Sequence, residues 1–313
     1  MPRKTGNDTA GTWAAVVGGA NMDVGGRPDR ALIAADSNPG RVWLSPGGVG
    51  RNIAHNMALL GVETKLITVL GEDLYARNIA GTCGELGIDL TGTLRVPGGN
   101  TPTYLYITDE HGEMALAISD MEICRLLTPE VLAPQRERLS RAAVVVVDAN
   151  IPEESIRWLC GNVPVPLFAD PVSVTKAEKL LGVLGSFDTV KPNRAEAERL
   201  SGITIRDRSD LRRAAEVILA AGVRRVFISL GEQGVYAADG TGQVLLPPLG
   251  TQAVSTTGAG DAFMTGLVWA RLRGAGLEES AGAGLAAAAL ALESAGTVNP
   301  DMSERALTAL LDK

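Results

Sequence analysis

Ser255-Thr-Thr-Gly-Ala-Gly-Asp-Ala-Phe-Met-Thr-Gly266 is the stretch around which the rest of the sequence can be interpreted. Gly258 and Gly260 permit tight backbone conformations, and the segment from Asp261 to Arg273 is rich in helix formers. A glycine turn that leads into a helix directs unpaired N–H groups and the positive end of the helix dipole toward one point. The stretch therefore predicts an anion site with the Asp261 carboxylate beside it, where that carboxylate can act as a general base. The alternative is an Asp that caps an ordinary helix.

Short apolar segments alternate with helical segments along the chain, which predicts a mostly parallel sheet covered by helices. The expected strands are residues 14–17, 65–70, 142–147, 165–169, 189–190 and 225–228, and the expected helices include 52–60 and 281–291. Four of these strands run into polar or glycine-bearing turns, which begin at Asp148, Asp170, Lys191 and Ser229. Because ligands bind at the carboxyl ends of parallel strands, we expect the site at this edge.

Two segments break the alternation of strand and helix. Residues 23–44 and 100–118 alternate in polarity like hairpin strands, and the second turns at residues 109–112. They predict a small β lid near residues 23–45 and 99–121, and a lid would exclude water from a reaction that water can intercept. The alternative is two antiparallel additions to the main sheet.

Length and composition fit one large α/β domain. The chain has 313 residues, of which 45% are hydrophobic, and we expect a disordered tail over 1–13 followed by one domain over 14–313. The net charge of −7, without a basic cluster, argues against a nucleic-acid partner. The three cysteines are far apart and the two histidines have no metal-ligand spacing. With no apolar run of membrane length, a cytoplasmic protein without a membrane partner is expected.

A second glycine-rich segment precedes the expected helix 52–60. It matches neither the dinucleotide-binding pattern nor a phosphate loop of the Gly-Lys-Ser/Thr type. Gly47 and Gly48 would let a small polyol approach the backbone, and the Asn52 amide can donate to and accept from vicinal hydroxyls. Asn21 and Asp23 could add the same chemistry after the first strand. The alternative for each is ordinary turn chemistry.

A third motif, Lys191-Pro192-Asn193-Arg194-Ala195-Glu196, ends a strand and opens a helix. Asn193 and Glu196 share a helix face and could hold a hydrated Mg²⁺ through its waters. The alternative is a capping box, in which the same two side chains satisfy the first turn of the helix.

Together these motifs resemble a known family. Residues 47–54 and 256–261 resemble the two signatures of the ribokinase-like (PfkB) carbohydrate kinases, and Asn193 with Glu196 resembles the family's Asn-x-x-Glu element. The resemblance extends over the chain from about Ala14. It implies a three-layer α/β/α fold with a mostly parallel central sheet and a small β-sheet lid.

A narrower pattern lies within the family resemblance. Residues 36–40, 119–121 and 170–173 resemble those of members that phosphorylate the ribose 5′-hydroxyl of pseudouridine with ATP. The alternatives are a family kinase for another nucleoside or sugar, and a non-catalytic sensor that binds a sugar or nucleotide. Retention of Asp261 argues against the sensor, because a pure binder does not need the base.

The resemblance assigns roles to residues of this chain. Asp261 would take the proton of the 5′-hydroxyl, while the amides of Gly258, Ala259 and Gly260 stabilise the transferring phosphoryl group. Mg²⁺ would be organised by Asn193 and Glu196. The implied ATP-binding residues are Lys191, Asn193, Ser229, Gly231, Gly234, Thr257, Gly258 and Gly260.

The implied substrate contacts come from the start of the chain and from the lid. The ribose 2′- and 3′-hydroxyls would meet Asp23, Gly47, Gly48 and Asn52, with Asn21 lining the same pocket. Ser37, Asn38, Thr103 and Asp120 would face the uracil. A C-linked uracil exposes an extra ring N–H, so an acceptor such as Asp120 could select pseudouridine over uridine.

The resemblance also bears on a monovalent cation and on assembly. Ser255 stands where the family's second signature usually has Asp, and a neutral hydroxyl is a weaker ligand for K⁺, so potassium activation is left open. Backbone oxygens near Ala295, Gly296 and Asn299 are the remaining candidate ligands. In this family lids often pair, and an isolated lid sheet needs cover, so a homodimer through the lid is expected.

Overall fold

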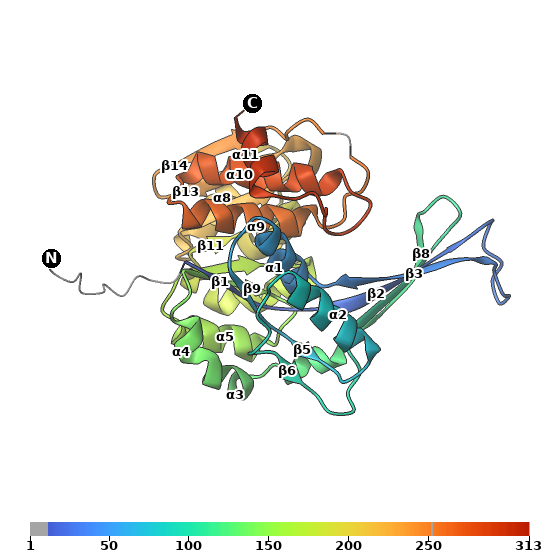
Figure 1. Ribbon diagram of the computed structural model, residues 1–313. Helices are drawn as coiled ribbons and strands as arrows, with labels where there is room; N and C mark the ends of the chain where they lie inside the picture. Colours follow the sequence, from blue (N-terminus) through green and yellow to red (C-terminus); the bar gives the residue numbers. More distant parts are fainter. Residues whose placement is uncertain (1–11, 252, 313) are drawn as a thin grey trace, which may run out of the picture.

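The computed structural model describes residues 12–251 and 253–312. An eight-stranded sheet lies between two layers of helices, and a second, four-stranded sheet projects to one side (Figure 1). The order of the main sheet is β14-β13-β12-β11-β10-β9-β1-β4, and the strands from β12 to β4 are parallel. Its strands are β1 (Ala14–Val17), β4 (Thr64–Ile67), β9 (Val144–Asp148), β10 (Leu167–Asp170), β11 (Thr189–Val190), β12 (Arg225–Ser229), β13 (Val235–Asp239) and β14 (Gly242–Leu246). The three-layer α/β/α architecture predicted from the sequence is confirmed.

The centre of the sheet follows from a run of valines. β9 reads Val-Val-Val-Val-Asp and pairs on both sides, with β1 and with β10. Val144 and Val146 pack into one hydrophobic core, whereas Val145 and Val147 pack into the other. A strand covered on both faces needs apolar side chains at every position, and β-branched residues suit that setting.

Helices cover the two faces of this sheet. One layer contains α1 (Val49–Leu59), α2 (Leu74–Glu85), α9 (Ala259–Leu272), α10 (Leu277–Leu292) and α11 (Glu304–Leu311). The other contains α3 (Pro129–Leu132), α4 (Arg136–Leu139), α5 (Glu153–Asn162), α6 (Val174–Ala177), α7 (Arg194–Ser201) and α8 (Arg208–Ala220). Four 3₁₀ segments complete the described helices: η1 (Glu122–Leu126), η2 (Ala133–Gln135), η3 (Glu178–Ser186) and η4 (Gly231–Gln233).

The expected strand over residues 65–70 is divided in two. β4 ends at Ile67, and β5 (Val69–Leu70) leaves the main sheet to pair with β6 (Leu94–Arg95). The backbone N–H of Leu94 donates to the carbonyl of Thr68, and that of Val96 donates to Leu70. The apolar pattern predicted the extended backbone, but the change of partner depends on a segment more than twenty residues further along the chain.

The projecting sheet is formed by the two predicted hairpin segments. Its order is β3-β2-β7-β8, and its strands are β2 (Asn21–Pro28), β3 (Gly40–Gly47), β7 (Thr103–Thr108) and β8 (Met114–Asp120). β2 and β7 pair in parallel at its centre. The alternative, two additions to the main sheet, is therefore wrong, because these strands pair with each other. We call this sheet the lid.

The folded part of the chain begins close to the first predicted strand. Most of the predicted N-terminal tail, residues 1–11, lies outside the described residues. Trp13 lies inside: its carbonyl accepts from the Ala143 N–H at 2.9 Å, and the Lys65 ammonium lies 3.9 Å from its ring centroid, so the folded part begins before Ala14. Within residues 12–251 and 253–312, none of the helices has both the length and the apolar character needed to cross a bilayer.

Candidate active site

The N-terminus of α9 lies where the sequence predicts an anion site. Gly258 is the N-cap residue with φ +83, a left-handed conformation that favours glycine. A Cβ at this position would lie 1.9 Å from the Thr297 carbonyl oxygen. Only a glycine therefore brings the loop this close to its neighbour, and the first N–H groups of α9 stay available to a ligand.

Asp261 lies in the first turn of α9 and meets a side chain from α1. The Asn52 Nδ2 donates to Asp261 Oδ2 at 2.8 Å, across 209 residues of sequence. Burial raises the pKa of Asp261 to about 7, and the charge of Asp170 adds to this, while Asn52 and Lys191 act in the opposite direction. A carboxyl whose pKa lies near neutrality is suited to accept a proton and release it again.

A buried ion pair lies beside this carboxyl. The Lys191 Nζ is 3.1 Å from Asp170 Oδ2, and both side chains are almost fully buried. Burial disfavours charge on Lys191, yet the carboxylates of Asp170, Glu196 and Asp261 keep its pKa above the ordinary value. The Nζ lies 3.3 Å from where a Cβ of Gly260 would be, so a cation stands over the turn that opens α9.

The predicted hydroxyl-binding residues meet where the lid joins the body. Asn21 Nδ2 donates to Asp23 Oδ1 at 2.6 Å, and Asn21 pairs with Gly47 across β2 and β3. A Cβ on Gly47 would lie 2.3 Å from Asp23 Oδ2, and Gly48 has φ +94. The glycines therefore make room for the Asp23 carboxylate and for the turn into α1. These contacts bring Asn21, Asp23, Gly47 and Gly48 together, and α1 carries Asn52 from the same turn.

Asn193 and Glu196 form a capping box at the start of α7. The Glu196 N–H donates to Asn193 Oδ1 at 3.0 Å, and the Asn193 N–H donates to Glu196 Oε2 at 2.9 Å. Among the residues described, no group of three His, Cys, Asp or Glu side chains is arranged to hold a metal ion. A metal held directly by several carboxylates does not fit, whereas a hydrated ion does, because Mg²⁺ keeps several of its waters. Burial raises the pKa of Glu196, so a nearby cation would favour its charged form.

The remaining predicted nucleotide-binding residues lie along the same edge of the sheet. Ser229 ends β12 and forms a bridge with Asn193, which joins the end of β12 to the capping box. Gly231 and Gly234 both have positive φ in the turn that includes η4. Thr257 lies in the exposed loop before α9, and its N–H donates to the Ser255 hydroxyl at 3.2 Å.

The predicted nucleobase contacts are spread over the lid. Thr103 and Asp120 face each other across β7 and β8, and Thr103 pairs with Met22. Asp23 is one residue further along β2, so its side chain points to the opposite face of the lid. The structure therefore brings Thr103 and Asp120 together but does not place them on the same face as Asp23.

Ser37 and Asn38 lie in the hairpin loop at the far end of the lid. From Asp23 to the end of β2 at Pro28 the strand rises about 17 Å. The Asn38 side chain bonds within its own loop, to the backbone of Ile33 and of Asp36. These two residues do not join the site of their own chain.

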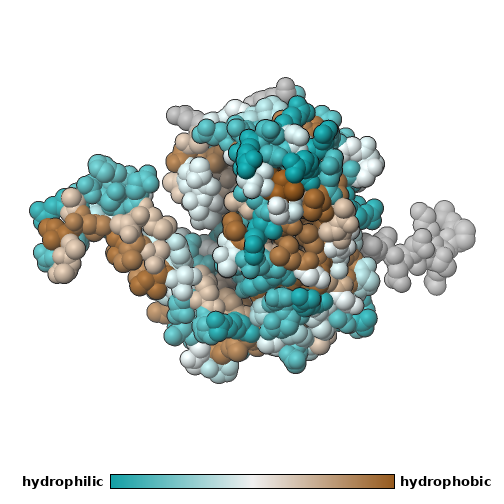
Figure 2. All heavy atoms as spheres, turned by 180° about the vertical axis from the view of Figure 1, so that it is seen from behind, coloured by the Kyte–Doolittle hydropathy of each residue, from teal (hydrophilic) through white to brown (hydrophobic). Residues whose placement is uncertain are grey.

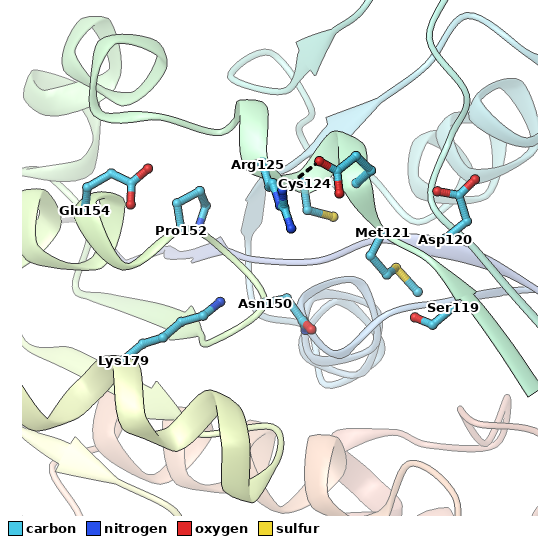
Figure 3. A pocket seen from close by; sticks show the side chains of 10 residues that line it. Ser119, Asp120, Met121, Cys124, Arg125, Asn150, Pro152, Glu154 and Lys179 are labelled. Atoms are coloured by element: carbon cyan, nitrogen blue, oxygen red, sulfur yellow. Dashed lines mark ion pairs between the residues drawn. The ribbon is translucent and has the colours of Figure 1, made fainter.

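A cleft of about 580 Å³ opens between the end of β8 and the loop after β9. Ser119, Asp120 and Met121 line it from the lid side, and Asn150 and Lys179 approach from the body (Figure 3). The Asn150 Nδ2 is 3.1 Å from where a Cβ of Gly19 would be, which places the cleft next to the residues predicted to bind hydroxyls. The cleft is large enough for a nucleobase.

Comparison with known proteins agrees with this geometry. Residues 12–305 match the pfkB family of carbohydrate kinases. The chain is 41% identical to the pseudouridine kinase of Escherichia coli, over 93% of this chain and 94% of that protein. It is 36% identical to the uncharacterised sugar kinase YeiI of the same organism, over 93% of this chain and 81% of that protein. Among solved structures, a putative sugar kinase from Clostridium perfringens matches with a TM-score of 0.88 at 33% identity, over 96% of each chain.

The chain belongs to the pfkB family of carbohydrate kinases.

Three residues of this pfkB-family kinase were given no functional role from the sequence: Asp148, Lys176 and Val172. Asp148 accepts from the Gly19 N–H at 2.8 Å and so ties the end of β9 to the end of β1. Lys176 Nζ donates to Asn150 Oδ1 at 2.6 Å beside the cleft. Val172, which follows Asp170-Pro171, has φ +67, a strained conformation for a β-branched residue. The signal that could have found Asp148 and Val172 is their place at the end of β9 and just after β10, whereas Lys176 lies within α6 and has no such signal.

Ser255 is the departure from the family pattern in this kinase. Its hydroxyl already accepts a hydrogen bond from Thr257, and Asn299 uses its amide on the carbonyl of Leu290 and the N–H of Asp301. Both side chains are engaged within the protein. A potassium site is therefore not part of the function proposed below.

Proposed function

We propose that this kinase transfers the γ-phosphoryl group of ATP to the ribose 5′-hydroxyl of pseudouridine. The observation that carries the proposal is the Asp261 carboxyl, which has a pKa of about 7, accepts from Asn52 and lies in the first turn of α9. The identity to a pseudouridine kinase, higher than to the YeiI sugar kinase, favours this substrate over other acceptors. ATP as donor fits the cytoplasmic location predicted from the sequence.

In the proposed reaction, Asp261 removes the proton of the 5′-hydroxyl. The ribose oxygen forms a bond to the γ-phosphorus while the bond from that phosphorus to the bridging oxygen breaks, and ADP leaves. The N–H groups of Gly258, Ala259 and Gly260 stabilise the oxygens of the group in transfer, together with Lys191. Catalysis is then mostly positioning and electrostatics, which suits a site built from rigid strand ends and one helix N-terminus.

The nucleotide lies along the C-terminal edge of β11 and β12 in this proposal. Ser229, Gly231, Gly234 and Thr257 approach it from their loops, and bound Mg²⁺ supplies charge neutralisation of the phosphates. Asn193 and Glu196 hold the ion through its waters, which is compatible with the capping bonds that they make.

The acceptor occupies the junction of lid and body. Asn21, Asp23 and Asn52 bind the ribose 2′- and 3′-hydroxyls, over the backbone of Gly47 and Gly48. The uracil extends into the cleft that Ser119 and Asp120 line at the end of β8, where the lid meets the body. Asp120 accepts from the ring N–H that pseudouridine exposes and uridine lacks.

Replacement of Asp120 tests this discrimination. Asp120→Ala is expected to abolish the preference of the kinase for pseudouridine over uridine, measured as the ratio of the two kcat/KM values. Glu122→Ala is the matched control, because Glu122 lines the same cleft but pairs with Arg125 at 2.9 Å. Unchanged discrimination in Asp120→Ala would contradict the assignment.

We also propose a homodimer formed through the lid. Its exposed strands carry large apolar side chains, including Leu44, Leu116 and Ile118, each more than half exposed. Figure 2 shows apolar surface along the projecting sheet. Ser37 and Asn38, at the far end of the hairpin, would then face the nucleobase held by the second copy.

The first experiment is steady-state phosphorylation of pseudouridine, uridine and ribose with Mg-ATP, alongside Asp261→Asn. A strong preference for pseudouridine that collapses in the variant supports both the substrate and the base. Robust turnover of uridine or ribose would retain the mechanism and contradict the role of the lid residues. No turnover of any acceptor would favour a non-catalytic sensor.

A further inference from the structure

Arg51 is a charged side chain that is buried beside the proposed base. It belongs to α1 and is 3% exposed. Its Nη2 donates to the Pro46 carbonyl at 2.6 Å and to Asn52 Oδ1, and its Nη1 lies 2.8 Å from His55 Nδ1. The guanidinium therefore contacts the amide that in turn contacts Asp261, but not the reacting atoms.

Packing alone does not account for a guanidinium at this position. Among the residues that the structure describes, its Nε has no hydrogen-bond partner. Burial lowers the pKa of Arg51, and the charged or titratable groups that face it are Cys83 on α2, Asp23 on β2 and Asp261 on α9. A buried charge with an unpaired N–H is costly, so an apolar side chain would fill the space at a lower cost.

The guanidinium fixes which way round the Asn52 amide lies. A guanidinium has donors only, so the Asn52 atom that faces Arg51 must be the oxygen. The nitrogen of the same amide is then left to face Asp261 Oδ2, to which it donates. His55 supports this arrangement, because burial and the nearby Arg51 lower its pKa to about 4, and its neutral ring can accept from Arg51.

We infer that Arg51 is a positioning residue that locks the Asn52 amide into donating to Asp261, and so keeps that carboxyl able to act as the base. Without Arg51 the amide can turn over and present its oxygen to Asp261. Two acceptors in contact need a proton between them, so Asp261 would hold its proton to a higher pH. The inference rests on the proposed function only for the role of Asp261 as base.

The other charged groups around Asp261 lie at, or just after, the ends of three strands of the main sheet. Asp170 at the end of β10 and Asp148 at the end of β9 favour the protonated carboxyl, whereas Lys191 after β11 favours the carboxylate. Asp261 also faces the charge of Arg51 directly, so removing that charge is expected to raise the pKa of Asp261 to some extent without Asn52. The effect that passes through Asn52 is therefore measured as the part of the pKa change that requires the amide.

The test is the ionisation of Asp261 in Arg51→Met and Arg51→Lys. The pKa of Asp261 is measured by NMR on protein labelled with ¹³C at aspartate carboxyls, with its resonance identified by its absence from Asp261→Asn. The pH dependence of kcat is measured in parallel. In Arg51→Met the pKa is expected to rise by about one, so that kcat falls several-fold more at pH 7 than at pH 9.

Two further variants make the test specific. In an Asn52→Leu background, Arg51→Met is expected to raise the pKa of Asp261 by clearly less than in the wild-type background, because only the direct loss of charge remains and the amide that transmits the rest is absent. Arg51→Lys keeps the charge and the apolar stem but lacks the planar guanidinium. The pKa of Asp261 in this variant is therefore expected to lie between its values in the wild type and in Arg51→Met. Arg51→Lys carries the test by itself if Arg51→Met does not fold.

The inference is overturned if the pKa of Asp261 does not change in Arg51→Lys or Arg51→Met, even if kcat falls equally at every pH. It is also overturned if the change is as large in the Asn52→Leu background as in the wild-type background. Because the NMR measurement needs no substrate, these outcomes stay separate from the question of which acceptor the kinase phosphorylates.

Discussion

At the scale of single residues, Asp261 combines two properties that normally oppose each other. It is buried among other carboxylates, which raises its pKa to about 7, and it lies in the first turn of a helix beside Lys191. The first property strengthens it as a proton acceptor and the second keeps the anion accessible. Its environment is therefore tuned for proton transfer near neutral pH.

The pH dependence of the reaction should follow this carboxyl. Only the unprotonated form can act as the base, so kcat/KM is expected to fall about tenfold for each pH unit below about 7 and to level off above it. Asp261→Asn should lower kcat by about 10²–10⁴-fold and abolish this limb of the profile. A wild-type profile that is flat between pH 5 and 8 would contradict the assignment.

The same carboxyl should cost stability. Its pKa is raised in the folded protein, so the folded state holds the proton between about pH 4 and pH 7, and stability falls as the pH rises through that window. Asp261→Asn removes the buried charge and should raise the thermal midpoint at pH 8 by about 2–4 °C for each kcal/mol gained. The difference between variant and wild type should disappear near pH 4, and scanning calorimetry at the two pH values measures it.

At the scale of one element, the entry into α9 depends on a close backbone contact. The left-handed Gly258 lies against the Thr297 carbonyl, so the loop that carries the N–H groups proposed to bind the anion is held against the segment after α10. A matched glycine occurs at the other end of the same helix. Gly274 has φ +72, with nothing within 4 Å of where its Cβ would be.

Alanine substitutions at these two glycines separate backbone strain from displacement of the anion site. Both should lose roughly 1 kcal/mol or more from the left-handed conformation. Gly258→Ala should also lower kcat/KM for ATP by at least about tenfold, because the loop must move away from Thr297, whereas Gly274→Ala should leave it near the wild-type value. Steady-state kinetics on both variants test this, and an equal effect of the two would contradict the role of the contact.

At the scale of the whole molecule, the lid presents an apolar face made by its register. Leu44, Val24, Leu105 and Ile118 are cross-strand neighbours in one row over β3, β2, β7 and β8. Cross-strand neighbours point to the same face, so the row is continuous. An exposed apolar sheet face of this kind is typical of a protein interface.

A charge in this face should prevent the proposed dimer. Leu116→Glu is expected to convert the kinase from dimer to monomer in sedimentation or light-scattering measurements, because a carboxylate would be buried without a partner. Leu181→Glu, an exposed leucine on η3 outside the lid, is the control and should leave the assembly unchanged. A monomeric wild-type protein at micromolar concentration would contradict the proposal.

The sequence by itself determined the layers and the motifs. The valine run of β9 is typical of a strand covered on both faces, and the alternation of strands with helices predicted a mostly parallel sheet around it. The glycines at the start of α9 predicted the turn, because only glycine adopts that backbone easily. These features are local, so composition and spacing are sufficient to find them.

Only the tertiary structure decided which residues of these motifs contact one another. The hydrogen bond between Asn52 and Asp261 and the pairing of Lys191 with Asp170 depend on how strand ends are placed. The same holds for the lid, where register sends Asp23 and Asp120 to opposite faces. Spacing along the chain does not carry this information, because hydrogen bonds and buried charges depend on distances that close only when segments far apart in the sequence pack together.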